Sequence, residues 1–386
     1  MTSLRSRILD VAHVSGSDEK AWRDLARRAV EPNPFYEPDC LIPAARHQSF
    51  GDEVQLVVAE DDDRFYACLP IRHVSRWHKL PYRIVTTQVR RMIYLGTPLM
   101  DAERGTEAVA ALLEALVQER RAGKSRVLAV QELTEGPTAA CFRAAASHLG
   151  LPLITFESFE RGLLRRQEPS GYELAHSPRT FRNLRRKQRN LGKLLGVTLD
   201  VVDRGKDPEA VNDYINLEAS GYKADAGVAM VTAPGEPEFF REMCQRFSDA
   251  GRLHLYCLTN GSQTVAMIAW VRSCDTIFQF KWSYDESYAR FSPGLILHTE
   301  VMRCFQQDTD AALLDSCTWG ENEMINQLYP DRRRITSFFI ILGPSWLDRL
   351  VVRAFIGLRP AHRKLYALVH RGDQRGKRAP GDHGAA

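Results

Sequence analysis

The sequence predicts an α/β protein of two similar modules, each a mixed, mainly antiparallel sheet flanked by helices. Its 386 residues are enough for two domains of roughly 150 to 200 residues. Three strand patterns joined by hairpin turns lie within 253–284, and a helix, a strand, a helix and a strand follow them. The first part of the chain has a similar order of elements. We therefore interpret the two halves as one fold used twice.

The first half is predicted from its hydrophobic spacing and its turn residues. Apolar residues at helical spacing predict helices over 18–30, 41–50, 106–121 and 138–149. Runs of β-branched and aromatic residues predict strands over 54–59, 65–72, 92–95, 126–130 and 153–159. A basic segment, 161–177, is interrupted by glycine and proline and is typical of a linker.

The second half repeats this alternation. We expect helices over 179–195, 208–218, 238–250, 293–305 and 322–328, and strands over 197–202, 253–258, 264–272, 276–284, 313–317 and 335–342. The predicted division is a first module over 1–160, the linker over 161–177 and a second module over 178–345. A basic amphipathic helix within 346–370 follows, and the tail 371–386 is too polar and too rich in glycine and proline to fold.

The composition is that of a soluble globular protein. Hydrophobic residues make up 44% of the chain, charged residues 26%, and the formal net charge is +4. No apolar run approaches the length of about 18 residues that a transmembrane helix needs, and the N-terminus lacks the apolar core of a signal peptide. The eight cysteines are scattered singly, so we expect neither a disulfide framework nor a metal site. The predicted location is the cytoplasm.

The stretch 276–305 predicts an anion site. A strand rich in aromatic residues leads through a polar loop to a helix that Ser292 is placed to cap, with Pro293 and Gly294 after it. The first N–H groups of a helix have no partner within the helix and attract anions. Neither a Walker A motif nor a dinucleotide-binding G-x-G-x-x-G motif is present. We expect Phe291 to Leu295 to bind phosphate groups; the alternative is an ordinary helix start.

The helix predicted over 179–195 is strongly basic. It carries seven basic residues and no acid between its first residue and Lys193: Arg179, Arg182, Arg185, Arg186, Lys187, Arg189 and Lys193. Such a density of like charge costs self-repulsion, which an anionic partner would relieve. A solvated basic face on a packed helix is the alternative.

Several motifs in the second half resemble those of a known family. They are LEASGYK from Leu217, KWSYDE from Lys281 with Tyr288 after it, FSPG from Phe291, and Leu314-Asp315-Ser316. The series is similar to that of the CelD-like family of GNAT acyltransferases, named after a cellulose-biosynthesis protein and related to the double-GNAT Fem peptidyltransferases. Weaker matches in the first half are Trp22, PNPF from Pro32 and Thr97-Pro98-Leu99. The resemblance covers roughly residues 15 to 345.

The resemblance implies transfer of an acyl group from acyl-CoA to an amine or hydroxyl acceptor, without a metal. The acceptor would be an envelope polysaccharide, lipid or amino-sugar precursor. Such chemistry needs an anchored donor, a polarised carbonyl and a base. The backbone of Phe291, Ser292, Pro293, Gly294 and Leu295 would hold the donor. The candidate catalytic residues are Asp285, Glu218 and Asp315 as base, Lys281 as carbonyl or phosphate ligand, and Tyr284 as acid. The candidate substrate-binding residues are Tyr222, Lys223, Trp282 and Arg186.

Alternatives stay open at this point. Lys281 with Asp285, or Lys223 with Glu218, can form structural ion pairs. The phosphate loop has one glycine where ordinary GNAT enzymes have several, so an aminoacyl-tRNA-dependent peptidyltransferase of the Fem type is the enzyme rival. A non-catalytic module of a polysaccharide-synthesis complex is a third hypothesis. The basic helix could place 346–364 on the inner face of a membrane, although such helices more often pack on their own domain.

Overall fold

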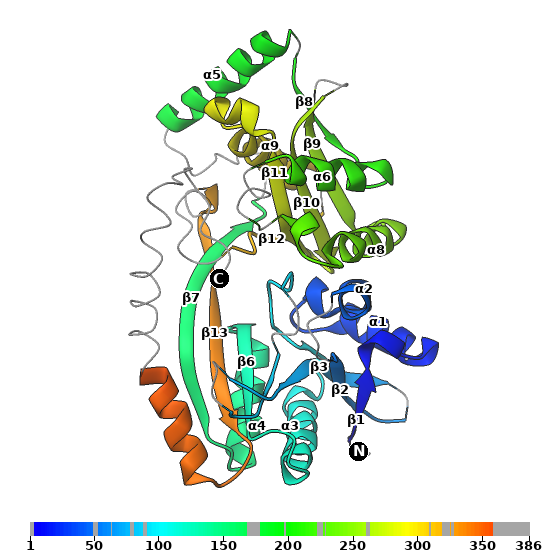
Figure 1. Ribbon diagram of the computed structural model, residues 1–386, viewed down its shortest axis with the longest axis vertical. Coiled ribbons are helices and arrows are strands. Elements are labelled where there is room, and N and C mark those ends of the chain that lie inside the picture. The colour runs from blue at the N-terminus through cyan, green and yellow to red at the C-terminus, as the bar shows by residue number, and fades with distance from the viewer. Residues whose placement is uncertain are drawn as a thin grey trace.

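The computed structural model describes residues 4–48, 53–62, 64–77, 81–87, 91–167, 178–196, 198–221, 227, 229–259, 263–308, 310–318, 325 and 328–357. Its two halves lie one above the other along the long axis of the molecule (Figure 1). The strands of the described residues join in one sheet with the order β1-β2-β3-β4-β6-β13-β7-β12-β11-β10-β9-β8, and β5 pairs with β3. The predicted α/β class, with mainly antiparallel strands flanked by helices, is confirmed.

The first half contains most of the predicted elements. Its strands are β1 (Arg5–Asp10), β2 (Gln55–Glu60), β3 (Phe65–Val74), β4 (Ile84–Thr86), β5 (Leu99–Met100), β6 (Val127–Thr134) and β7 (Leu153–Arg165). Its helices are α1 (Gly16–Arg28), α2 (Pro38–His47), α3 (Gly105–Arg121) and α4 (Pro137–His148). The sequence pattern did not reveal β1 and β4, because β1 is an edge strand with charged, exposed residues and β4 has only three residues.

The strand predicted over 92–95 is wrong. That segment is apolar and largely buried, but it pairs with none of the described strands. The amide nitrogen of Asn33 instead donates to the carbonyl oxygens of Leu95 and Thr97, at 3.0 and 2.8 Å. A side chain therefore satisfies backbone groups that a neighbouring strand would otherwise pair.

The second half has α5 (Pro178–Leu195), α6 (Glu209–Ala219), α8 (Glu236–Asp249) and α9 (Pro293–Asp308). Its strands are β8 (Asp200–Asp203), β9 (Leu253–Thr259), β10 (Thr264–Ser273), β11 (Thr276–Tyr284), β12 (Leu313–Asp315) and β13 (Asp331–Ile341). Most of the helix predicted over 322–328 and the tail 371–386 lie outside the described residues.

The two halves repeat one topology. In the first, β1 to β4 are antiparallel neighbours, and β4 then pairs in parallel with β6, which follows α3. In the second, β8 to β11 are antiparallel neighbours, and β11 pairs in parallel with β12, which follows α9. A parallel neighbour needs a crossover, and the helix provides it in both halves.

Two long strands interlock the halves. The last strand, β13, lies between β6 and β7 and so completes the sheet of the first half. The end of β7 reaches the second half, where Leu163–Arg165 pair with β12; Figure 1 shows β7 and β13 running side by side along one side of the molecule. The linker predicted over 161–177 therefore begins later, because 161–165 belong to β7 and Arg161 is buried.

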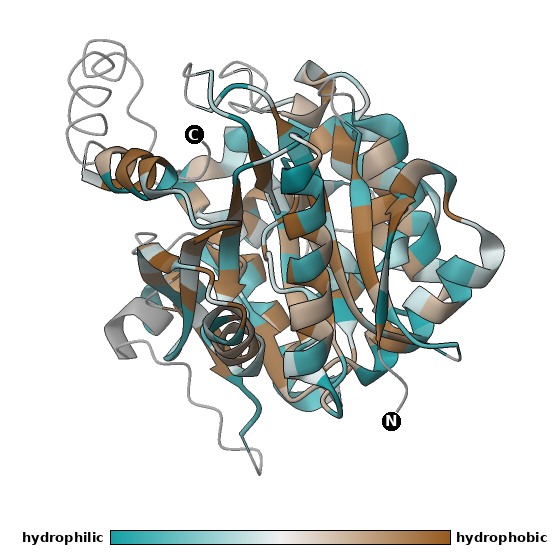
Figure 2. Cartoon of the chain, turned by 90° about the horizontal axis from the view of Figure 1, so that it is seen from below, coloured by the Kyte–Doolittle hydropathy of each residue, from teal (hydrophilic) through white to brown (hydrophobic). Residues whose placement is uncertain are grey.

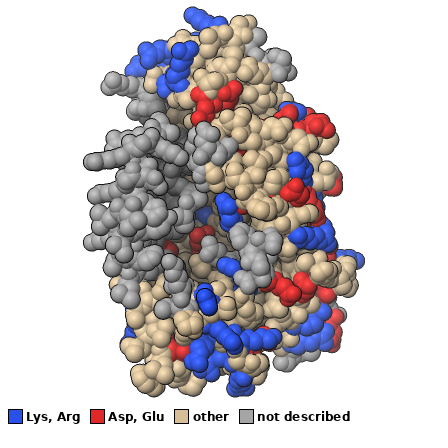
Figure 3. Space-filling view, viewed as in Figure 1, with Lys and Arg blue, Asp and Glu red and all other residues tan. Residues whose placement is uncertain are grey.

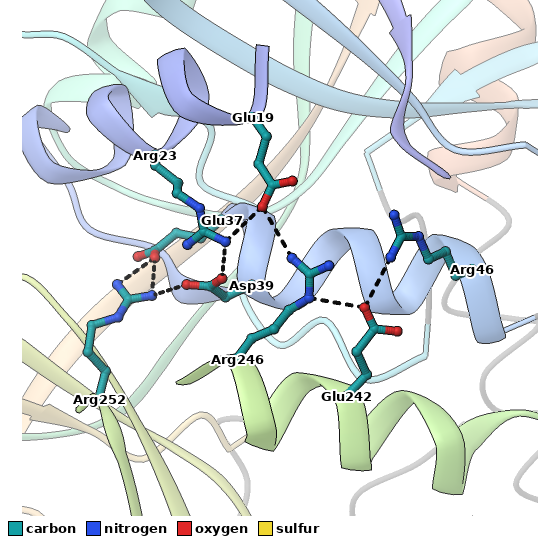
Figure 4. A network of polar contacts seen from close by, with 8 residues as sticks. All are labelled: Glu19, Arg23, Glu37, Asp39, Arg46, Glu242, Arg246 and Arg252. Atoms are coloured by element: carbon teal, nitrogen blue, oxygen red, sulfur yellow. Dashed lines mark hydrogen bonds and ion pairs between the residues drawn. The ribbon is translucent and has the colours of Figure 1, made fainter. Parts of the chain in front are cut away.

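A polar network also joins the halves (Figure 4). Arg252, the residue before β9, lies 2.6 Å from a carboxylate oxygen of Glu37 and 2.9 Å from one of Asp39, both at the start of α2. Arg246 of α8 reaches Glu19 of α1 at 3.2 Å. Beneath these ion pairs, one hydrophobic cluster contains side chains from both halves, including Phe35 and Phe280. The halves therefore share a core.

Candidate functional site

Strand β11 is longer than its parallel neighbour β12, so the two strands pair over only the first part of β11. The parallel register pairs Thr276 with Leu313 and ends with Phe278 opposite Asp315, whereas β11 runs on to Tyr284. Between residues 279 and 284, β11 has β10 as its neighbour on one edge and no described strand on the other. This half of β11 therefore has one edge, here called the opening between β11 and β12, without a strand partner among the described residues. Figure 3 shows a hollow near the middle of the molecule in this view, with basic and acidic atoms in it.

The start of α9 lies beside this opening. Ser292 has a left-handed backbone (φ 56°), and its carbonyl oxygen accepts the N–H of Ile296 at 3.1 Å. In the described part of the chain, the N–H groups of Gly294 and Leu295 have no recorded acceptor. A Cβ on Gly294 would lie 2.6 Å from the Trp282 ring, so glycine lets α9 pack directly on β11.

Lys187 of α5 is placed over the same helix start. Its Nζ donates to Ser292 Oγ at 2.7 Å. An ammonium group beside the positive end of a helix dipole is unfavourable unless an anion lies between them. Five further basic residues of α5 are exposed: Arg182, Arg185, Arg186, Arg189 and Lys193. The charge of α5 and the N–H groups of α9 together favour a phosphate group at this position.

His298 lies one turn into α9, against the edge of the Trp282 ring at 5.2 Å between ring centroids. It is 1% exposed, and neither ring nitrogen has a hydrogen-bond partner among the described residues. Burial lowers the pKa of His298 from 6.5 to about 4. The imidazole is therefore neutral at physiological pH.

This burial predicts a pH dependence of stability. As the pH falls below 6.5 the unfolded chain gains a proton at His298 and the folded chain does not, so stability is lost until the pH reaches about 4. The difference amounts to about 3 kcal/mol. Urea unfolding of wild type and His298→Leu between pH 7 and 4 should show a steeper loss for wild type. Parallel curves for the two proteins would contradict the prediction.

The opposite face of β11 carries a buried ion pair. Lys281 Nζ lies 2.9 Å from Glu218 Oε1 of α6, and Glu218 Oε2 accepts the N–H of Met230 at 2.9 Å. The two side chains are 13% and 1% exposed. Lys281 thus pairs with Glu218 and not with Asp285. Asp285 instead caps the following turn, where its carboxylate accepts the N–H of Ser287 at 2.9 Å.

Glu236 is a buried carboxylate that the sequence analysis missed. It is the first residue of α8 and 1% exposed, and neither oxygen has a hydrogen-bond donor within the described residues. Its nearest partner is Arg91 of the first half, whose Nε lies 3.3 Å away. Burial raises the pKa of Glu236, the positive charges of Arg91 and Lys281 oppose this, and Glu218 adds to it. The sequence signal that could have drawn attention to Glu236 is its place in Gly235-Glu236-Pro237, a typical helix start.

Two tyrosines lie close to these carboxylates. Tyr94 of the first half packs edge-on against Phe280 at 5.5 Å between ring centroids. Burial and the charge of Glu218 raise the pKa values of Tyr94 and Tyr214. Both phenols therefore stay protonated and can act as hydrogen-bond donors. One polar cluster therefore contains side chains from both halves: Arg91 and Tyr94 from the first, and Glu218, Glu236 and Lys281 from the second.

Asp315 is buried in ion pairs with two arginines. Arg161 of β7 contacts both of its carboxylate oxygens at 2.8 and 2.9 Å, and Arg333 of β13 lies at 2.6 Å. Arg161 also donates to the carbonyl oxygen of Tyr94 at 2.7 Å. Burial acts to raise the pKa of Asp315, but the charges of the two arginines outweigh it and lower the pKa. The carboxylate is therefore a poor proton acceptor that ties β12 to β7 and β13.

The other predicted residues differ in their environments. Tyr284 and Trp282 stack at 5.9 Å between ring centroids, over the start of α9. Arg186 is exposed and donates to Asn183 at 3.0 Å. Tyr222 and Lys223 lie outside the described residues. Within the described chain, His, Cys, Asp and Glu residues form no group of three or more that could hold a metal ion.

Comparison with known proteins gives a family match for the part of the chain that contains this opening. Residues 178–317 match the family model described as an acetyltransferase (GNAT) domain. FemX has a TM-score of 0.58 and 10% identity over 89% of this chain and 99% of that chain. No curated protein matches the sequence.

Two further solved structures share the fold. The C-terminal domain (DUF2156) of an Agrobacterium fabrum protein assigned as a lysylphosphatidylglycerol synthetase has a TM-score of 0.52 and 11% identity over 85% of this chain and 92% of that chain. L-PGS from Bacillus licheniformis has a TM-score of 0.51 and 8% identity over 89% and 96%. Residues 178–317 of the second half thus match a GNAT-type acetyltransferase domain, and the chain as a whole shares its fold with these three structures.

Proposed function

We propose that the protein transfers an acyl group from acyl-CoA to an amine or hydroxyl of an envelope polysaccharide, lipid or amino-sugar precursor. The observation that carries the proposal is the opening between β11 and β12 beside the start of α9, with Lys187 2.7 Å from Ser292 Oγ. Phosphate oxygens bound there would accept the N–H groups of Gly294 and Leu295 and neutralise Lys187. The match of residues 178–317 to the GNAT acetyltransferase model supports the same reaction class.

The acceptor would enter between the two halves. Glu236 is the base in this proposal, because its buried carboxylate has a raised pKa and no hydrogen-bond donor in the described chain. It would take a proton from the acceptor as the acceptor attacks the thioester carbonyl carbon. Lys281, held by Glu218, would orient the acceptor, and a protonated tyrosine would supply a proton to the departing thiolate. Tyr284, on the open half of β11, is the candidate for that role.

The donor site is tested by thermal unfolding of the purified protein with coenzyme A, acetyl-CoA and a long-chain acyl-CoA. A ligand at a hundred times its Kd adds about 2.7 kcal/mol to the free energy of unfolding. We expect stabilisation by at least one thioester. Lys187→Gln should weaken that binding about 10- to 100-fold, because a hydrogen bond from a charged group contributes roughly 1.5–3 kcal/mol.

Lys193→Gln is the matched control, since Lys193 is exposed on the same helix. It should bind the thioester as wild type does. Equal effects of the two substitutions would indicate general electrostatic attraction and count against a phosphate site at α9. No stabilisation by any thioester would exclude acyl-CoA as the donor.

A second candidate is transfer from an aminoacyl-tRNA. The five exposed basic residues of α5 are more positive charges than one pyrophosphate group would neutralise. The chain also shares the fold of FemX. Binding of tRNA would weaken steeply with salt. Salt-dependent tRNA binding that Arg182→Gln and Arg189→Gln reduce, without any response to thioesters, would favour this candidate over the first.

A further inference from the structure

The helix formed by residues 346–357 presents an apolar and basic face to solvent. Among the described residues, three of the six exposed large hydrophobic side chains lie within five consecutive positions of this helix: Trp346 (69% exposed), Leu347 (51%) and Leu350 (57%). Arg349 and Arg353 are exposed as well. At 3.6 residues per turn these five side chains cover an arc of about 160°, with the arginines along one border. Figure 2 shows the helix at the margin of the molecule, with hydrophobic residues on it.

The opposite face of this helix is anchored to the first half. Val352 is buried, and the Phe355 ring lies 3.8 Å from the Trp77 ring between centroids. Asp348 is 1% exposed; it accepts the hydroxyl of Tyr82 at 2.8 Å and lies 3.4 Å from Arg126. The helix cannot bury its outer face by rotating without breaking these contacts. The part of the chain that the structure describes therefore leaves this outer apolar face exposed.

The charge of the outer face indicates the partner. Asp348 is the one acidic residue in 346–357, and it is buried, so the exposed charges of the helix are both positive. A tryptophan and leucines bordered by arginines are the pattern of a helix that lies in the interface of an anionic bilayer. We propose that this face docks the protein on an anionic lipid surface, with Trp346, Leu347 and Leu350 in the headgroup region. In the described chain, no helix is long and apolar enough to cross a membrane.

The experiment is sedimentation of the purified full-length protein with vesicles of phosphatidylcholine alone and of phosphatidylcholine mixed with phosphatidylglycerol. We expect binding to the mixed vesicles and much weaker binding to phosphatidylcholine. Trp346→Ser with Leu350→Ser should reduce binding at least tenfold. Arg349→Gln with Arg353→Gln should reduce binding to the mixed vesicles about thirtyfold, from roughly 1 kcal/mol for each arginine near the surface.

Val202→Ser is the control, because Val202 is also exposed (43%) but lies on β8 in the other half. It should bind the mixed vesicles as wild type does. Absence of vesicle binding by folded wild-type protein would overturn the proposal. The proposal would also be overturned if the helix variants bound vesicles as wild type does, or if they changed only the oligomeric state of the protein. The assay needs no acyl donor, so its outcome is independent of the proposed transfer reaction.

Discussion

Replacing Asp315 by asparagine should destabilise the protein by about 3–5 kcal/mol, because it leaves buried arginine charge without its partner. Arg161 is 2% and Arg333 12% exposed in their side chains, and both contact the Asp315 carboxylate. Urea unfolding at pH 7 measures the loss. Asp310→Asn is the matched control, because Asp310 also pairs with an arginine, Arg272, but its side chain is 82% exposed. The control should unfold close to wild type.

The same ion pairs predict how the free energy of unfolding falls at acid pH. The pKa of Asp315 is lowered in the folded protein. Its stabilising contribution is therefore fully present above the ordinary aspartate pKa of about 3.9 and is lost as the pH falls through the folded value. Asp315→Asn should lack this part of the acid transition. A variant as stable as wild type at pH 7, with the same acid limb, would show that the two arginines find other partners.

Replacing Glu236 by glutamine should lower kcat/KM by about 10²- to 10⁴-fold, the usual contribution of a general base. The measurement is release of free thiol from a thioester donor in the presence of amine and amino-sugar acceptors. Folding should change little, because the substitution removes a buried carboxylate with no hydrogen-bond donor, and its partner Arg91 is 44% exposed. Glu238→Gln, on the same helix with a 56% exposed side chain, is the control and should keep wild-type turnover.

The pH profile distinguishes a base from a structural residue. The pKa of Glu236 is raised by burial, so wild-type kcat/KM should rise with pH as this carboxylate loses its proton. In Glu236→Gln that limb should be absent. Wild-type turnover in the variant would remove Glu236 from the mechanism, and a lower rate with an unchanged pH profile would assign it a structural role.

Much of the architecture could be predicted from local patterns in the sequence. The alternating aromatic strand β11, the serine, proline and glycine at the start of α9 and the basic residues of α5 each carry a local signal. From these the α/β class, the repeated module and the proximity of a strand end to a helix start follow. Local signals failed for β4, which is short, and for residues 92–95, whose backbone a side chain satisfies.

The candidate site depended on contacts that no local pattern encodes. Glu236 and Arg91 are far apart in the sequence and meet because the halves share one core. Asp315 looks like a base at a strand end, yet the insertion of β13 beside β7 surrounds it with arginines. Hydrophobic periodicity and helix capping act between near neighbours, so the sequence by itself determined the elements and their order. Burial and pairing of charges arise between distant segments, so only the tertiary structure decided that Asp315 and Glu218 are held in buried ion pairs and that Glu236 is buried beside Arg91.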